Sequence, residues 1–190
     1  MLKQVNWIDI FVVILLLRSI YVAIKNDFSI ELFKLLGTVF AAYLSLHYYL
    51  IFSDYIASRT GINNIPSAYL TSFSIIALAI VGYLVFVLLR SVFYRLINME
   101  VAPKLNKWGG LLFGLSRGLL LISLIIFILV TSGSGYLKVS VRTSYSGKRL
   151  LKIAPSVYSG LWHNIASKFF TQEKFNQTVL EVPRTLDSGE

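Results

Sequence analysis

Four long apolar stretches dominate the sequence and restrict what the chain can fold into. They are separated by short polar linkers and cover about residues 7–24, 30–52, 68–92 and 108–131. Because an α-helix of about 20 residues crosses ~30 Å of hydrocarbon, each stretch is long enough to span a membrane. Lipid also requires backbone hydrogen bonds to be satisfied within the segment, which favours helices. The sequence therefore predicts an all-α integral membrane protein, with four transmembrane helices in a membrane domain over residues 1–132.

The composition agrees with a chain that is largely covered by lipid. Of its 190 residues, 56% are hydrophobic and only 14% are charged, and the mean hydropathy is +0.69. Soluble domains are normally about a quarter charged. The chain has no cysteine, which excludes disulfide bonds, thiolate metal sites and cysteine nucleophiles. Its net charge of +9 is typical of basic loops near anionic headgroups, and we expect no nucleic-acid partner because the basic residues flank apolar stretches.

Glycines recur every four residues at the start of the fourth stretch. Gly110, Gly114 and Gly118 lie on one face if the segment is helical. Glycine in a helix costs about 1 kcal/mol relative to alanine in water, whereas in lipid small residues allow two helices to approach closely. The second stretch has its own row of small residues, Gly37, Ala41 and Ser45. We expect the two rows to pack against each other. A glycine-rich loop before a buried helix is the disfavoured alternative, because no phosphate-loop pattern is present.

Three charged residues fall within the same half of the predicted membrane domain: Arg18, Glu31 and Arg117. A rise of 1.5 Å per residue places all three within about 13 Å of one membrane face. Each costs roughly 2.5–3.5 kcal/mol in hydrocarbon without a partner, so we expect a buried charge cluster, which Asp9 near the opposite face does not reach. The favoured interpretation is structural, with arginines that snorkel and share one glutamate. An ion or substrate path is the alternative.

No pattern indicates a catalytic, cofactor or metal site. The sequence lacks a serine–histidine–aspartate arrangement, an H-E-x-x-H motif and paired carboxylates on one helix face. His47 and His163 are isolated in the sequence, and we interpret them as interfacial polar residues rather than ligands. We therefore expect a protein that is not an enzyme and needs no cofactor.

Residues 133–190 have the composition of a soluble tail. Within them, residues 155–170 place apolar side chains at helical spacing, at Val157, Leu161, Ile165 and Phe169. This pattern predicts an amphipathic helix that lies flat on the membrane or packs on the bundle. The final twenty residues are expected to be an unstructured, flexible tail.

The distribution of lysine and arginine predicts the orientation. The first–second and third–fourth connections carry Lys25, Lys34, Arg90, Arg95, Lys104 and Lys107. The opposite side carries Lys3, Arg59, Lys138 and Arg142. The larger number of basic residues is expected on the cytoplasmic side, which places both termini in the periplasm.

Residues 106–118, N-K-W-G-G-L-L-F-G-L-S-R-G, resemble the D-R-x-x-G-x-x-F-G-x-x-R-G motif of the colicin V production protein (CvpA) family. Residues 6–10 (N-W-I-D-I) and 31–37 (E-L-F-K-L-L-G) also resemble the start of that family. The resemblance covers roughly residues 5–131, with Asn106 and Lys107 where the family usually has aspartate and arginine. It implies a bacterial inner-membrane protein with four spans, of a kind required for colicin V production in its namesake.

Two hypotheses for function follow. The first is a non-enzymatic, multi-pass protein that supports toxin production or export and envelope homeostasis. Its expected partners are the lipid bilayer and either a second copy of the chain or other membrane proteins. The alternative is a small channel or transporter subunit in which Arg18, Glu31 and Arg117 line a path between protomers.

Overall fold

The computed structural model describes residues 6–60, 66–96 and 103–188, and these residues form helices and short connections without a strand. Four long helices come first: α1 (Trp7–Lys25), α2 (Phe28–Thr60), α3 (Ser67–Leu96) and α4 (Pro103–Thr131). Shorter helices follow: α5 (Gly135–Thr143), α6 (Tyr145–Leu151), α7 (Ile153–Leu161), a π-helical turn (Trp162–Ala166), α8 (Ser167–Phe169) and α9 (Thr178–Ser188).

The four long helices are each long and apolar enough to cross a membrane. This confirms the predicted all-α architecture with four membrane spans. One boundary differs, because α2 has 33 residues and continues past residue 52 to Thr60. No glycine or proline interrupts the chain between Gly37 and Gly61, so nothing stops the helix where the sequence becomes more polar.

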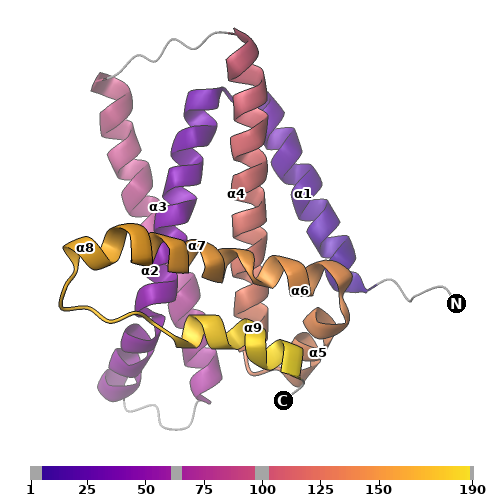
Figure 1. Ribbon diagram of the computed structural model, residues 1–190, viewed down its shortest axis with the longest axis vertical. Helices are drawn as coiled ribbons and strands as arrows, with labels where there is room; N and C mark the ends of the chain where they lie inside the picture. The colour runs from indigo at the N-terminus through magenta and orange to yellow at the C-terminus, as the bar shows by residue number, and fades with distance from the viewer. Residues whose placement is uncertain (1–5, 61–65, 97–102, 189–190) are drawn as a thin grey trace, which may run out of the picture.

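The long helices form a bundle in which α4 lies between α1 and α2, and α3 packs on the other side of α2 (Figure 1). The core between them contains buried Leu46, Ile75, Leu120 and Phe127. The outer faces carry many exposed apolar side chains, including those of α1 and α3. Helices that are apolar on all sides are typical of lipid-embedded segments.

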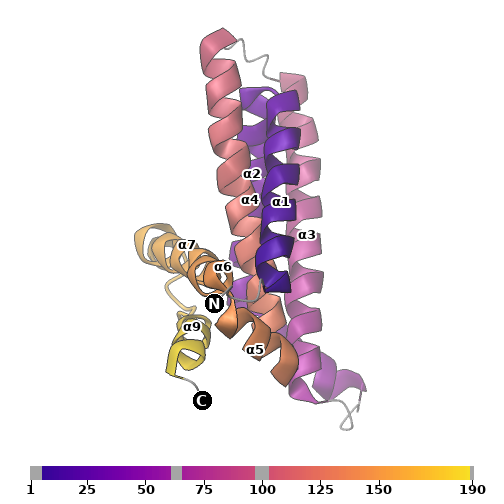
Figure 2. The ribbon, with the colours of Figure 1, turned by 90° about the vertical axis from the view of Figure 1, so that its right-hand side faces the viewer.

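The chain after α4 folds back onto one end of the bundle. Gly133, with φ of 75°, makes the turn, since this backbone conformation favours glycine. Helices α6 to α8 then run across the long helices (Figure 1), and Figure 2 shows them standing to one side of the bundle with α9 beneath them. Buried Val141 and Leu151 belong to the same core cluster as the bundle residues.

The C-terminal region is therefore more ordered than the sequence predicted. The amphipathic segment expected over residues 155–170 corresponds to α7, the π-helical turn and α8. The expectation of an unstructured, flexible final segment is wrong, because α9 forms there with Val179 and Leu186 buried. The helix is short and contains Pro183. Proline disfavours a helix interior, so the helical spacing of Val179, Val182 and Leu186 was not recognised.

Candidate functional site

The glycine row of α4 packs against α1 and the corner between α1 and α2. A Cβ atom at Gly114 would overlap with Ala23, and one at Gly118 would lie 2.6 Å from the Ser19 Oγ. A Cβ at Gly110 would lie 3.1 Å from the Asn26 carbonyl oxygen. The row therefore lets the two helices approach more closely than any larger side chain would allow.

The predicted partner of this row is wrong. A Cβ at Gly37 would meet the ring of Phe86 on α3, and Ala41 lies against Gly82 of the same helix. Ser45 is buried, and its hydroxyl donates to the Ala42 carbonyl oxygen at 3.1 Å. The small residues of α2 therefore accommodate α3 rather than α4. The spacing of small residues identifies a helix face that can pack closely, but it does not identify the helix that packs there.

Asn106 at the start of the α4 motif fixes the corner that the glycines contact. Its side-chain oxygen accepts a hydrogen bond from the Phe28 backbone nitrogen at 2.6 Å. Its amide nitrogen donates to the Asp27 Oδ1 at 2.7 Å. Asn106, on α4, thus accepts a hydrogen bond from a backbone N–H in the first turn of α2 that has no partner within that helix. An N-cap residue has the same role within its own helix.

Glu31, on the first turn of α2, is fully buried and has several partners. Its Oε2 lies 3.1 Å from the Arg117 Nε, and its Oε1 lies 3.2 Å from the Lys34 Nζ. The Asn26 side chain donates to the same Oε1 at 2.6 Å. Glu31 therefore joins α1, α2 and α4 in one polar cluster, and Arg117 reaches it across the glycine face of α4.

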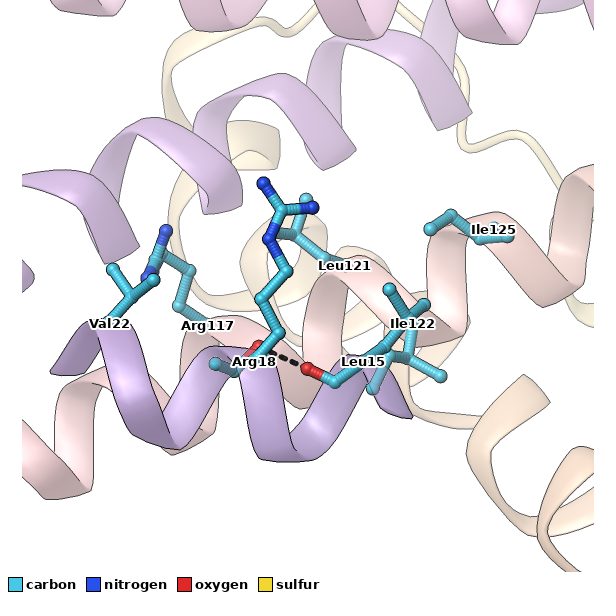
Figure 3. Close-up of a pocket in the computed structure, with 9 residues that line it drawn as sticks. Leu15, Arg18, Val22, Arg117, Leu121, Ile122 and Ile125 are labelled. Atoms are coloured by element: carbon cyan, nitrogen blue, oxygen red, sulfur yellow. Dashed lines mark hydrogen bonds between the residues drawn. The ribbon is translucent and has the colours of Figure 1, made fainter. Parts of the chain in front are cut away.

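Arg18 does not share Glu31, contrary to the prediction. Its side chain is exposed on α1, and together with Arg117 it lines a groove of about 260 Å³ between α1 and α4. Figure 3 shows the two arginines extending from these helices, with Leu15, Ile122 and Ile125 farther along the groove. The predicted cluster of three is thus a Glu31–Arg117 pair with a separate arginine beside it.

A second polar network lies just past the middle of α2, which spans Phe28–Thr60. His47 is 5% exposed, and its Nε2 lies 3.0 Å from the Glu173 Oε2. The Tyr48 hydroxyl donates to the Glu173 Oε1 at 2.7 Å. Trp162 stacks on the His47 ring, with 5.0 Å between the ring centroids. The sequence did not indicate this network, because its histidine and glutamate are 126 residues apart.

The hydrogen-bond partners of Tyr158 assign the proton positions in this network. Burial raises the pKa of Tyr158 to about 12, so its hydroxyl is protonated at neutral pH. The Asn176 backbone N–H donates to the hydroxyl oxygen at 3.0 Å, and the His47 Nδ1 lies 2.8 Å from the same oxygen. In the arrangement that uses every donor, the Tyr158 O–H donates to the His47 Nδ1. The His47 Nε2 then carries its hydrogen and donates to Glu173. This is the neutral tautomer of His47.

The N-terminus of α1 holds the C-terminal helices at a third contact. Asp9 Oδ1 accepts hydrogen bonds from the Ser144 hydroxyl at 2.7 Å and the Ser146 backbone nitrogen at 2.9 Å. It therefore places a carboxylate at the N-terminus of α6, where the helix dipole favours negative charge. The Asn6 side chain donates to the Ser140 carbonyl oxygen at 2.6 Å. Within the described ranges no three metal-ligating side chains lie together.

Comparison with protein families decides the identity of the chain. The model of the family described as "Colicin V production protein" matches residues 8–155. The chain belongs to this family. With its four apolar helices it is a multi-pass membrane protein. The match continues beyond residue 131 through α5 and α6, so the Asp9 contact lies inside the family region, whereas Tyr158 and Glu173 lie beyond it. No curated protein and no solved structure matches the chain significantly.

Proposed function

We propose that this protein supports toxin production or export and envelope homeostasis in the bacterial inner membrane, without catalysing a reaction. The observation that carries the proposal is the family match over residues 8–155, on a bundle with four membrane-spanning helices. The buried polar groups support a non-enzymatic role. Glu31, Asp9 and His47 each bind side chains or backbone groups of other helices. These contacts hold the helices together and occupy the three side chains.

The arrangement fits a membrane scaffold. The long helices bury a common core, while α5 to α9 stand at one side of the bundle and provide a further surface. Such a surface suits binding to other membrane proteins or to a second copy of the chain. The lipid bilayer is the remaining partner, and the proposal includes no nucleic acid.

A complementation experiment tests the role. A bacterial host that makes colicin V and lacks its own family member receives the wild-type chain or Gly114→Leu, with Gly160→Ala as a control because nothing lies within 4 Å of a Cβ at that position. Secreted toxin is measured by growth inhibition, and the envelope by detergent sensitivity. We expect the wild type and the control to restore both. If the wild type is produced in the membrane and restores neither, the proposed role is wrong.

The alternative is a small channel or transporter subunit. It is favoured by the groove that Arg18 and Arg117 line beside the buried Glu31, because charged groups within a membrane span commonly mark a solute path. The test is flux of ions or small solutes in liposomes containing the purified protein, compared with Arg117→Ala. Flux that changes with the substitution supports the alternative, and absence of flux at every pH tested removes it.

We also propose that both termini lie in the periplasm, as the lysine and arginine count favours. In the structure α6 contacts α1 and α4 and brings Lys148 and Arg149 to the end of the bundle where α1 begins. With these two residues included, the two sides carry equal numbers of basic residues, so the orientation needs a direct test. The absence of native cysteine allows a direct test by labelling intact cells with a membrane-impermeant maleimide. Lys174→Cys should react without permeabilisation and Lys107→Cys only after it. The reverse pattern would place the termini in the cytoplasm.

A further inference from the structure

The groove between α1 and α4 places two arginines at a depth where a membrane consists of hydrocarbon. Arg18 lies seven residues before Lys25, where α1 ends, which corresponds to about 10 Å along the helix. Arg117 faces it from α4, and Ser19 contributes a hydroxyl to the lining. The groove has a volume of about 260 Å³ and is otherwise lined by aliphatic side chains and Gly118.

The groove carries positive charge that the protein does not balance. Glu31 divides its two oxygens between Lys34 and Arg117, so one carboxylate serves two cations. No carboxylate pairs with Arg18 among the residues that the structure describes. An exposed arginine within a membrane span is costly unless a counter-charge or water reaches it. The position therefore favours an anionic ligand, which supplies the counter-charge directly.

The polarity of the groove changes along its length. Arg18 and Arg117 lie toward the end of the bundle where α1 joins α2, and Leu15, Leu121 and Ile125 lie about one to two turns deeper in the membrane. Because α1 and α4 run in opposite directions, Leu15, Leu121 and Ile125 lie on the same side of the arginines, and Val22 is the one apolar lining residue on the other side. This is the order of polarity of a phospholipid in one leaflet, with its headgroup toward the surface and its chains toward the midplane.

We propose that this groove binds an anionic phospholipid, with the phosphate at Arg18 and Arg117 and an acyl chain along Leu15, Leu121 and Ile125. A guanidinium group matches the geometry of a phosphate and binds it with charge-assisted hydrogen bonds. The Arg117 Nε faces Glu31, which fixes the orientation of that side chain, while Arg18 is exposed and supplies the unbalanced charge. A zwitterionic lipid brings its own cation and neutralises the site less well.

The test uses the full chain purified in detergent, with native mass spectrometry to count bound lipid. Dioleoyl phosphatidylglycerol and dioleoyl phosphatidylcholine are offered in equal amounts. We expect the wild type to retain phosphatidylglycerol preferentially, and Arg18→Gln to weaken that binding about tenfold, as loss of a charge-assisted hydrogen bond does. Arg59→Gln removes the same charge from an exposed position at the far end of α2 and should leave binding unchanged. Equal retention of the two lipids, or equal binding by the two variants, overturns the proposal.

Two further arms separate the lipid from a free anion and from a folding defect. Leu121→Trp keeps both arginines and fills the groove, and it should also lower phosphatidylglycerol binding. Binding at the wild-type level in that variant would show that the acyl chain lies elsewhere. Glycerol phosphate carries the same phosphate without chains and should not displace the lipid. If it competes as well as the intact lipid, the groove is a site for soluble anions and the lipid assignment is wrong.

Discussion

Two clusters of polar side chains on α2 differ in which parts of the chain supply their partners. At the first turn, Glu31 binds Arg117 and Asn26 within the corner that the family motif packs against. Sixteen residues farther along α2, His47 binds Tyr158 of α7 and Glu173 of the connection between α8 and α9. We call these the motif end and the tail end. The motif end lies within the family match and the tail end lies largely beyond it.

The difference separates contacts within the region that the family model matches from contacts made by the C-terminal residues beyond it. At the motif end, every contact joins the membrane helices, so losing one should affect the whole bundle. At the tail end, the contacts attach the C-terminal helices to the side of the bundle, so losing one should release those helices and leave the bundle folded. Four substitutions test this comparison, in order of decreasing expected effect.

Glu31→Gln should have the largest effect. It leaves Arg117 and Lys34 without their shared carboxylate, and breaking a buried ion pair typically costs about 3–5 kcal/mol. Thermal unfolding in detergent should show a large decrease in Tm for the whole protein. Glu181→Gln, at an exposed position on α9, is the control. A Tm of Glu31→Gln equal to that of the control would contradict the structural importance of the motif end.

Gly114→Ala should destabilise the bundle by about 1–3 kcal/mol, the usual cost of overpacking. The added methyl overlaps with Ala23, so Ala23→Gly in the same chain should restore part of the lost stability. Gly160→Ala, where the added atom meets nothing within 4 Å, is the control. If Ala41→Gly restored the stability instead, Gly114 would pack against α2, as the sequence predicted. Thermal unfolding of the single and double variants distinguishes the two.

Glu173→Gln should have a smaller and more local effect. It removes the negative charge that accepts hydrogen bonds from His47 and Tyr48, at a site that is one-third exposed, for a cost of about 1–2 kcal/mol. Hydrogen exchange should increase in α7 to α9, while α1 to α4 remain protected. Exchange that increases equally in all helices would mean that the two ends do not unfold separately.

Asp9→Ala should have the smallest effect, about 1 kcal/mol, which is typical of removing an N-cap group. It frees the N-terminus of α6 from α1, so limited proteolysis should become faster between α4 and α6. Asp54→Ala, at an exposed position on α2, serves as the control. If cleavage occurs at the wild-type rate, α6 is held by its apolar contacts alone.

The sequence predicted the elements of this fold better than their contacts. Hydropathy alone revealed four spans, because lipid requires long apolar helices whatever their neighbours are. The glycine row at Gly110, Gly114 and Gly118 was recognisable as a packing face, but its partner was not. Ser19 and Ala23 are also small and four residues apart, and spacing alone did not favour this short pair over the longer row on the second stretch. Helix α9 was missed for a similar reason: Val179 and Leu186 become significant only when a buried surface is there to receive them.

The distance between the motif end and the tail end along α2 should also influence which bilayer thickness matches the protein. Glu31 and His47 are sixteen residues apart, or about 24 Å along α2. Both side chains are buried, but their partners Lys34 and Glu173 are partly exposed. A thicker bilayer would bring one of these partners against acyl chains, whereas a thinner one would expose the apolar surface between them to water. Hydrophobic mismatch of this kind sorts proteins among membranes. This protein should therefore melt at its highest temperature in lipids of intermediate chain length.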